Sequence, residues 1–262
     1  MDITKFIINY RQPSQYIFGG ENYIEIYKPV DKVFKRTQVF ENTSLFDIDN
    51  YGIEEIKREL ADKETGLILN SANFIFNILE FEKIPFWEGL RKDLVQWRLQ
   101  KVFPEDIGLY EHDFFKLDKN KLLSILFKRA LKEQLEKTFG ENGIQLVYLG
   151  NSTIEIMNHL KKLKTGPDFF IEVDKSLSVV VFLNNSVPYY IRKFRSDKDV
   201  DITPEIVKTV NFVKKNYSIV PAVYTIVSNA AGFGFDAVRE QLSRLEIREL
   251  NFEQKKNLLL PA

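Results

Sequence analysis

The sequence contains no cysteine and only two histidines, His112 and His159. The absence of cysteine excludes thiol nucleophiles, disulfide bonds and cysteine-ligated metals. The two histidines stand too far apart in the sequence to form a local metal-binding motif. No Ser-His-Asp order and no phosphate-binding loop is visible either, so the sequence offers no support for a soluble enzyme of another kind.

Net charge is also absent, because 37 lysines and arginines balance 37 aspartates and glutamates over 262 residues. Without an excess of positive charge, we expect no binding to nucleic acid. The first residues, MDITKFIINYRQ, have an acidic second position and only a short apolar run, so they do not form a signal peptide. We therefore expect a soluble, metal-free domain.

What the sequence does contain is ample material for a core, since 44% of its residues are hydrophobic and 13% are aromatic. The chain length suits one large domain or two small ones.

Two blocks of the sequence show the same order of elements. Residues 14–42 alternate apolar and polar residues around tight turns, which predicts three short strands. A helical spacing follows over 51–63 and a short buried strand over 65–70. The second block repeats this order, with three strands over 168–195 and then a helix, strand, helix and strand over 202–217, 221–229, 233–244 and 245–251. This repeat of topology resembles the actin and Hsp70 superfamily.

The fold expected from this order is α/β, with two actin-like (ribonuclease H-like) βββαβα halves and an inserted α+β subdomain. The predicted divisions are a first half, an inserted subdomain, a second half and a tail that leads towards a membrane segment, at residues 1–70, 71–150, 151–250 and 251–262. Within the insertion, a predicted helix over 88–102 places Leu90, Leu94 and Trp97 on one face. We expect that face to be buried, with a cost of about 3–5 kcal/mol for Trp97→Ala.

The string GLRKDLVQWRLQKVFP within this helix is the most specific in the chain. It resembles a helix of the type IV pilus assembly proteins of the PilM kind and of the cytoplasmic domain of the type II secretion L protein (GspL), through Trp97, Arg98, Leu99, Lys101 and Pro104. The resemblance covers roughly residues 15 to 250 in order. It implies a cytoplasmic scaffold on the inner face of the bacterial inner membrane.

The partners implied by this resemblance are a PilN-like or secretion M-like inner-membrane protein, the motor ATPase of the machine, and a second copy in a homodimer. The scaffold would link the motor to the membrane and periplasmic alignment proteins. Whether the machine is a pilus or a secretion system stays open at this point.

The same resemblance raises the question of ATP, since actin-like ATPases hold phosphates on glycine-bearing hairpins and Mg²⁺ through a carboxylate. Here the matching places are degenerate, namely Gly19, Gly20, Asp174, Lys175, Gly232 and Gly234. The connection from Arg195 to Thr203 is also too short for the subdomain that covers adenine. We therefore expect no enzyme activity and no cofactor; the alternative is a nucleotide-dependent switch of the same machinery.

The last residues carry the other candidate site. Asn257, Leu258, Leu259, Leu260 and Pro261 resemble the short peptide by which PilN-like proteins bind PilM-like proteins just before a membrane helix. This likeness predicts a natural fusion that continues into a transmembrane segment beyond residue 262. Such a peptide would dock as an extended segment between the first half and the inserted subdomain.

Overall fold

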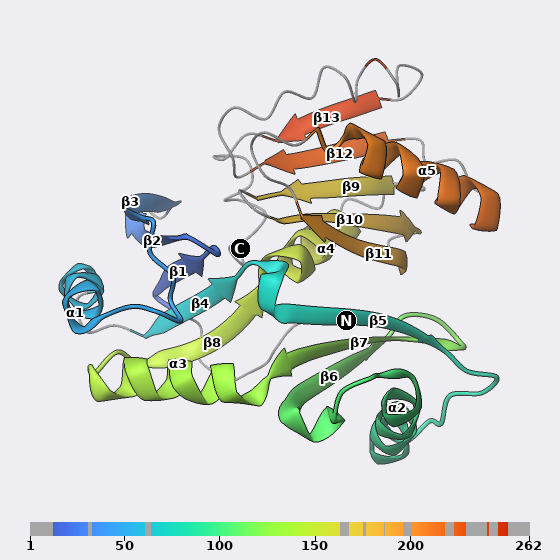
Figure 1. The fold of residues 1–262 in the computed structure, drawn as a ribbon, viewed down its shortest axis with the longest axis horizontal. Helices are drawn as coiled ribbons and strands as arrows, with labels where there is room; N and C mark the ends of the chain where they lie inside the picture. The colour runs from blue at the N-terminus through green and yellow to red at the C-terminus, as the bar shows by residue number, and fades with distance from the viewer. Residues whose placement is uncertain are drawn as a thin grey trace.

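The computed structural model describes residues 13–30, 33–60, 64–162, 168–174, 177–185, 187–195, 201–217, 223–228, 240 and 246–250. Its first half is a mixed five-stranded sheet in the order β3-β2-β1-β4-β8 (Figure 1). Its strands and the helix α1 are β1 (Gln15–Gly19), β2 (Tyr23–Val30), β3 (Val33–Glu41), α1 (Asn50–Glu59), β4 (Thr65–Leu69) and β8 (Leu146–Asn151).

The second half repeats this plan with a five-stranded sheet in the order β11-β10-β9-β12-β13. Its elements are β9 (Asp168–Val173), β10 (Leu177–Asn184), β11 (Val187–Arg195), α5 (Thr203–Tyr217), β12 (Val223–Ser228) and β13 (Glu246–Leu250). In each half, the first three strands pair antiparallel and the first strand then pairs parallel with the fourth. The predicted α/β fold of two duplicated actin-like halves is confirmed.

Between β4 and β8 the chain leaves the first half to build a separate three-stranded antiparallel sheet in the order β5-β7-β6. This inserted sheet and the rest of the connection comprise η1 (Ser71–Asn73), β5 (Phe74–Glu80), α2 (Glu88–Val102), η2 (Ile107–Leu109), β6 (Tyr110–Lys116), β7 (Lys121–Lys128) and α3 (Arg129–Glu141). The predicted range 71–150 therefore contains the insertion together with α3 and β8, and β8 completes the first sheet.

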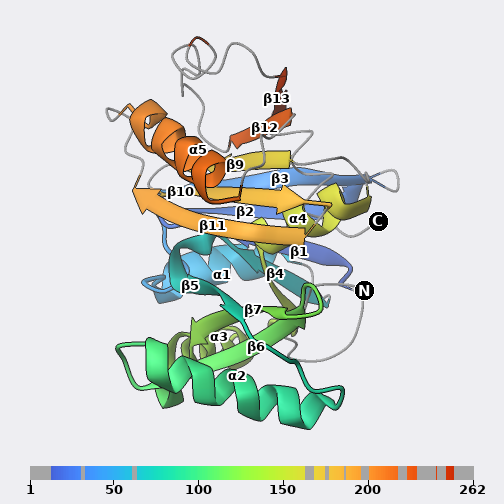
Figure 2. The same ribbon diagram turned by 90° about the vertical axis from the view of Figure 1, so that its right-hand side faces the viewer.

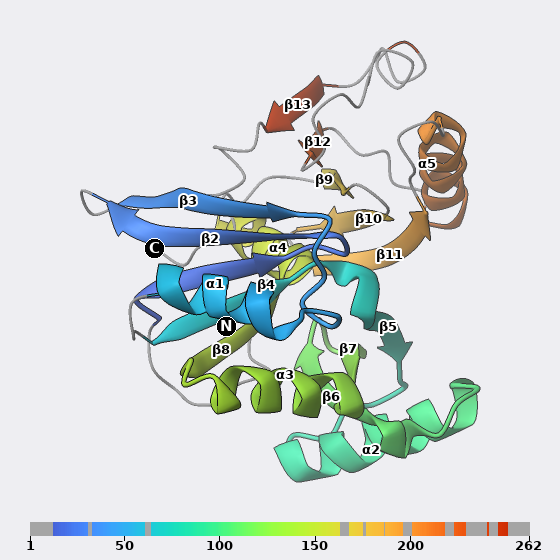
Figure 3. The ribbon, with the colours of Figure 1, turned by 60° about the vertical axis from the view of Figure 1, so that its left-hand side comes forward.

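One large apolar core joins all three parts. It contains Ile17 and Leu67 of the first sheet, Phe127 of the inserted sheet, and Phe170 and Val181 of the second sheet, all at most 1% exposed. The helix α4 (Ser152–Lys162) lies between the two five-stranded sheets (Figures 1 and 3). A smaller core packs α5 onto the second sheet, and another packs α2 onto the inserted sheet. The halves are thus held together by buried apolar surface as well as by the polar contacts described below.

The prediction that Trp97 is largely buried is wrong. The helix α2 presents Val95 and Leu99 to the inserted sheet, and both are fully buried. Leu90 and Trp97, on the other side of the helix, are 55% and 48% exposed. The reason is that α2 carries two apolar stripes at helical spacing, and only one of them can face the sheet.

Two predicted elements fall outside the described residues, namely the tail over 251–262 and, apart from residue 240, the helix over 233–244. Of the helices that the structure does describe, none combines the length and the apolarity needed to cross a bilayer.

Candidate functional site

Polar residues gather where strands of the two halves end. Asn70 follows β4, Asn151 ends β8, and Asp174 follows β9. Because β1, β4 and β8 run parallel, their carboxyl ends share one edge of the first sheet. In open α/β sheets this edge is where ligands bind. The side chains that meet here, which we call the interlobe site, are Tyr23, Asn70, Ser71, Asn151, Thr153, Glu172, Asp174 and Lys193.

Asp174, one of the residues singled out in the sequence, accepts hydrogen bonds from the first half. The hydroxyl of Tyr23 donates to its Oδ1 at 2.9 Å, and Nδ2 of Asn70 donates to its Oδ2 at 2.8 Å. All three side chains are buried. Burial and the neighbouring charge of Asp174 raise the pKa of Tyr23 well above its usual value, so this phenol stays a donor. Both carboxylate oxygens of Asp174 thus have partners inside the protein.

The two glycines of the first hairpin make room for side chains. A Cβ added at Gly20 would lie 2.1 Å from Cε1 of Tyr23, and one at Gly19 would lie 2.4 Å from Cδ1 of Leu45. The space beside each glycine is therefore occupied by the protein itself. The backbone N–H of Gly20 also donates to the carbonyl oxygen of Tyr23 at 2.9 Å, so this donor already has a partner within the protein.

A second set of hydrogen bonds runs beside the first. The hydroxyl of Thr153 donates to Oε2 of Glu172 at 2.5 Å, and it lies 2.6 Å from the hydroxyl of Ser71. Nδ2 of Asn151 donates to Ser71 Oγ at 3.0 Å, while its Oδ1 accepts the backbone N–H of Ile154 and so caps α4. The four polar side chains of this set are 3% exposed or less. Buried polar groups of this kind are stable only when they are satisfied, and here they satisfy one another.

Lys193 of β11 reaches from the second half into the first. Its ammonium group donates to the carbonyl oxygens of Ser71 at 3.0 Å, Ala72 at 3.4 Å and Phe74 at 2.5 Å. Burial lowers the pKa of Lys193. The three carbonyls belong to η1 and the start of β5, so this lysine joins β11 to the point where the insertion leaves the first half.

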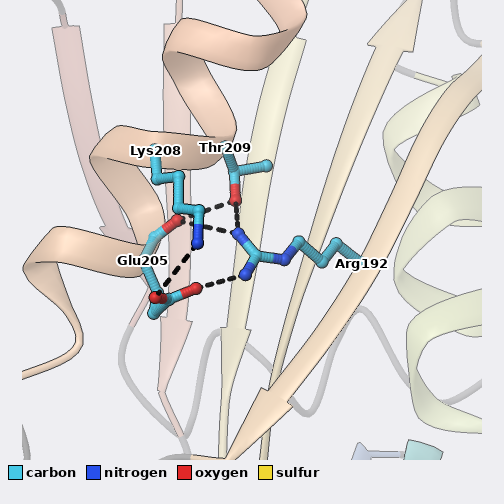
Figure 4. A network of polar contacts seen from close by, with 4 residues as sticks. All are labelled: Arg192, Glu205, Lys208 and Thr209. Carbon is cyan, nitrogen blue, oxygen red and sulfur yellow. Dashed lines mark hydrogen bonds and ion pairs between the residues drawn. The ribbon is translucent and has the colours of Figure 1, made fainter.

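The preceding residue, Arg192, points to the other side of β11 and holds α5 (Figure 4). Its guanidinium donates to Thr209 Oγ1 at 2.8 Å and pairs with the carboxylate of Glu205. Successive side chains of a strand point to opposite faces, so one strand anchors both α5 and the first half.

The electrostatics of the interlobe site do not favour a polyphosphate. Two carboxylates, Glu172 and Asp174, are buried here, and a phosphate beside them would be repelled. Lys193 brings a positive charge, but its contacts are with carbonyl oxygens. Within the described residues, no group of three or more histidine, aspartate or glutamate side chains is placed to hold a metal ion.

The structure brings together three of the residues singled out in the sequence, namely Gly19, Gly20 and Asp174. Tyr23 packs beside Gly20 and donates to Asp174. Asn70, which also donates to Asp174, donates its backbone N–H to the carbonyl oxygen of Gly19 at 2.9 Å. Lys175, Gly232, Gly234 and the peptide 257–261 lie outside the described residues. The connection between β11 and α5 spans residues 196–202.

Sequence reasoning missed most of the interlobe site, above all Tyr23, Thr153, Glu172 and Lys193. A signal for part of it was present, because Asn70-Ser71 and Asn151-Ser152-Thr153 come directly after buried strands. Polar residues at carboxyl ends of parallel strands are expected to meet at one edge.

No protein-family model matches the chain, and no curated protein matches it in sequence. Solved structures do match its fold. The PilM-PilN type IV pilus biogenesis complex contains a chain with 12% identity and a TM-score of 0.72, covering 95% of this chain and 94% of that one. The cytoplasmic domain of EpsL, an inner-membrane component of the type II secretion system of Vibrio cholerae, has 8% identity and a TM-score of 0.62 and covers 93% of each chain.

A third similar structure is a Bacteroides thetaiotaomicron protein with an actin-like ATPase fold and unknown function. It has 11% identity, a TM-score of 0.62 and 96% coverage of both chains. These matches cover nearly the whole of each chain, so they identify the fold as actin-like of the PilM and EpsL kind, at identities too low to carry more than the fold.

Proposed function

We propose that this protein is a non-catalytic scaffold of an inner-membrane assembly platform, in a type IV pilus or a type II secretion machine. The observation that carries the proposal is the interlobe site, where Tyr23 and Asn70 donate to the buried Asp174 carboxylate and Lys193 donates to a backbone carbonyl of Phe74. The likeness to PilM and to the EpsL cytoplasmic domain along the whole chain supports the choice of machinery.

The same contacts support the absence of catalysis that we propose. Phosphoryl transfer depends on preorganised donors and Mg²⁺ around the transferred group. Here the buried carboxylate of Asp174 accepts hydrogen bonds from Tyr23 and Asn70, and the hairpin glycines are covered by Tyr23 and Leu45. A nucleotide would have to break these bonds before it gained any of its own.

A fold of this kind without phosphoryl-transfer activity can still act by binding other proteins and holding them in place. The partners we propose are a PilN-like or secretion M-like inner-membrane protein and the motor ATPase, with a homodimer as the assembled form. The protein would work at the cytoplasmic face of the inner membrane. The peptide Asn257–Pro261 is the segment we expect to make or mimic the membrane-partner contact, as an added strand at a sheet edge.

The peptide contact is tested by deletion and restoration. The chain without residues 256–262 should melt at a lower temperature or change its oligomeric state, and a synthetic peptide of residues 251–262 should restore the original behaviour. A ligand that binds only the folded state raises its stability by mass action. A control peptide carrying Leu258→Asp and Leu260→Asp should have no effect. Identical behaviour of the full and shortened chains would refute the peptide contact.

The choice between a scaffold and a nucleotide-dependent switch is tested by a thermal-shift titration with Mg-ATP and Mg-ADP. We expect no shift at millimolar nucleotide. A saturable shift that Asp174→Asn removes would favour the switch.

A further inference from the structure

The side of α2 that faces away from the inserted sheet is unusually apolar. Trp87, Leu90, Leu94 and Trp97 follow one another at spacings of three or four residues, which places them on one face of the helix. Phe86 lies just before them. We call this set of five residues the α2 outer face.

This face holds the most exposed large apolar side chains of the described residues. Phe86 is 86% exposed and Trp87 is 71% exposed, and their rings contact each other edge to face. Single exposed apolar residues are ordinary on a protein surface, but a contiguous set marks an interaction site. The α2 outer face is therefore a surface that the protein keeps for contact.

Basic residues outnumber acidic ones on the helix that carries this face. The helix carries Arg91, Lys92, Arg98 and Lys101 against two acidic residues, an excess of two positive charges in a chain whose total charge is zero. The ammonium group of Lys101 lies 3.9 Å from the centre of the Trp97 ring. Long basic side chains beside aromatic rings keep their charges at the edge of an apolar layer while their stems stay within it.

The position of α2 leaves this face accessible along its full length. Figures 1 and 2 show the helix at the end of the molecule away from the second half, lying along the outer side of the inserted sheet. A flat surface can meet the helix there without meeting another element first.

We propose that the α2 outer face binds the surface of an anionic lipid bilayer, lying in the headgroup region without crossing the membrane. Aromatic and leucine side chains on one side and lysine and arginine beside them are the composition of interfacial helices. Anionic headgroups attract such basic segments through the surface potential.

The two tryptophans make the proposal directly measurable, because Trp87 and Trp97 are the only tryptophans in the chain and both belong to the α2 outer face. The full chain is mixed with vesicles of phosphatidylcholine alone or of phosphatidylcholine with phosphatidylglycerol. Intrinsic fluorescence and flotation with the vesicles are followed. We expect a blue shift, protection from a water-soluble quencher and flotation with the anionic vesicles only, all weakened by added salt.

Variants locate the contact. Arg98→Gln and Lys101→Gln should each weaken binding about fivefold, the usual loss for one basic residue near an anionic surface. Phe86→Ser should weaken it about tenfold, because a phenylalanine leaves the apolar layer. The matched controls Tyr51→Ser and Phe212→Ser remove exposed aromatic rings elsewhere and should bind as the unchanged protein does.

Two results would overturn the proposal. Tryptophan spectra unchanged by anionic vesicles would exclude the lipid contact and favour an acidic protein as the occupant of this face. Binding that all three variants leave intact would place the lipid contact elsewhere on the chain. No nucleotide or separate partner is added, and every variant keeps the chain's own residues 257–261, so the differences between variants are independent of the proposed scaffold role.

Discussion

Replacing Lys193 by methionine tests whether its ammonium group joins the two halves. The change keeps most of the side-chain length and removes the charge together with three donated hydrogen bonds, to the carbonyls of Ser71, Ala72 and Phe74. A hydrogen bond from a charged group contributes about 1.5–3 kcal/mol, and leaving a buried acceptor unsatisfied costs about 1–3 kcal/mol.

The free energy of unfolding lost in Lys193→Met should be smaller than the sum of three such contributions. The lowered pKa of Lys193 shows that burial already disfavours its charged form, which offsets part of the gain. Water can also replace some of the bonds, since Lys193 is only partly buried. We therefore expect Lys193→Met to lower the free energy of unfolding by about 2–3 kcal/mol. For a chain of this size that corresponds to a fall in melting temperature of about 4–10 °C.

The assay is urea denaturation followed by circular dichroism and by fluorescence, so that a separation of the two halves would appear as two transitions. The control is Lys208→Met on α5, where the lysine is 71% exposed and lies 3.9 Å from the Glu205 carboxylate. Exposed ion pairs contribute little, so this variant should stay within about 0.5 kcal/mol of the unchanged protein. If Lys193→Met lowered the free energy of unfolding no more than the control does, the ammonium group of Lys193 would not be what joins the two halves.

Three further predictions rest on the described contacts. Tyr23→Phe should cost about 1.5–3 kcal/mol in denaturation experiments, because it removes a donor from the buried carboxylate of Asp174; a neutral result would mean that this bond contributes nothing to stability. Leu99→Ala should cost about 2–5 kcal/mol, since the side chain is fully buried, whereas Trp97→Ala should cost clearly less, and the reverse order would contradict the orientation of α2. His112→Gln should change the pH dependence of stability, because burial, with Lys92 nearby, lowers the pKa of His112 in the folded state. As the pH falls through the histidine pKa of the unfolded chain, about 6.5, the unfolded chain binds more protons than the folded one, so stability drops by at most about 1.4 kcal/mol per pH unit. The variant should flatten that drop. Identical pH profiles for the variant and the unchanged protein would show that His112 does not contribute.

The order of strands and helices could be predicted from the sequence because it depends on local patterns. Alternating runs joined by turns predicted β1–β3 and β9–β11. The pattern over 202–217 predicted α5, whose buried residues include Ile206, Val210 and Val213 at helical spacing. The repeat of topology then followed from comparing the two blocks.

The orientation of α2 could not be predicted in the same way. The stripe of Leu90, Leu94 and Trp97 and the stripe of Val95 and Leu99 both have helical spacing. The choice between them depends on which one fits the inserted sheet, and that sheet is made of strands from elsewhere in the chain.

The interlobe site was hidden for a similar reason. Tyr23 and Asp174 are 151 positions apart in the sequence, and Lys193 lies 122 positions from Ser71. No local pattern indicates that such residues will meet. Only the end-of-strand positions of Asn70 and Asn151 could have suggested them.

The place of β8 in the first sheet affects the order in which the chain can fold during synthesis. Its partner β4 ends at Leu69, but β8 is complete only at Asn151, so the first half cannot close its sheet until the whole insertion has been made. The inserted sheet needs no residue after Lys128, since β6 pairs with the adjacent β7 and β5 pairs with β7 across the intervening α2 and β6. The newly made chain therefore carries a folded insertion on an open first half for the time it takes to add β8, and during that time the edge of β4 is exposed to other chains.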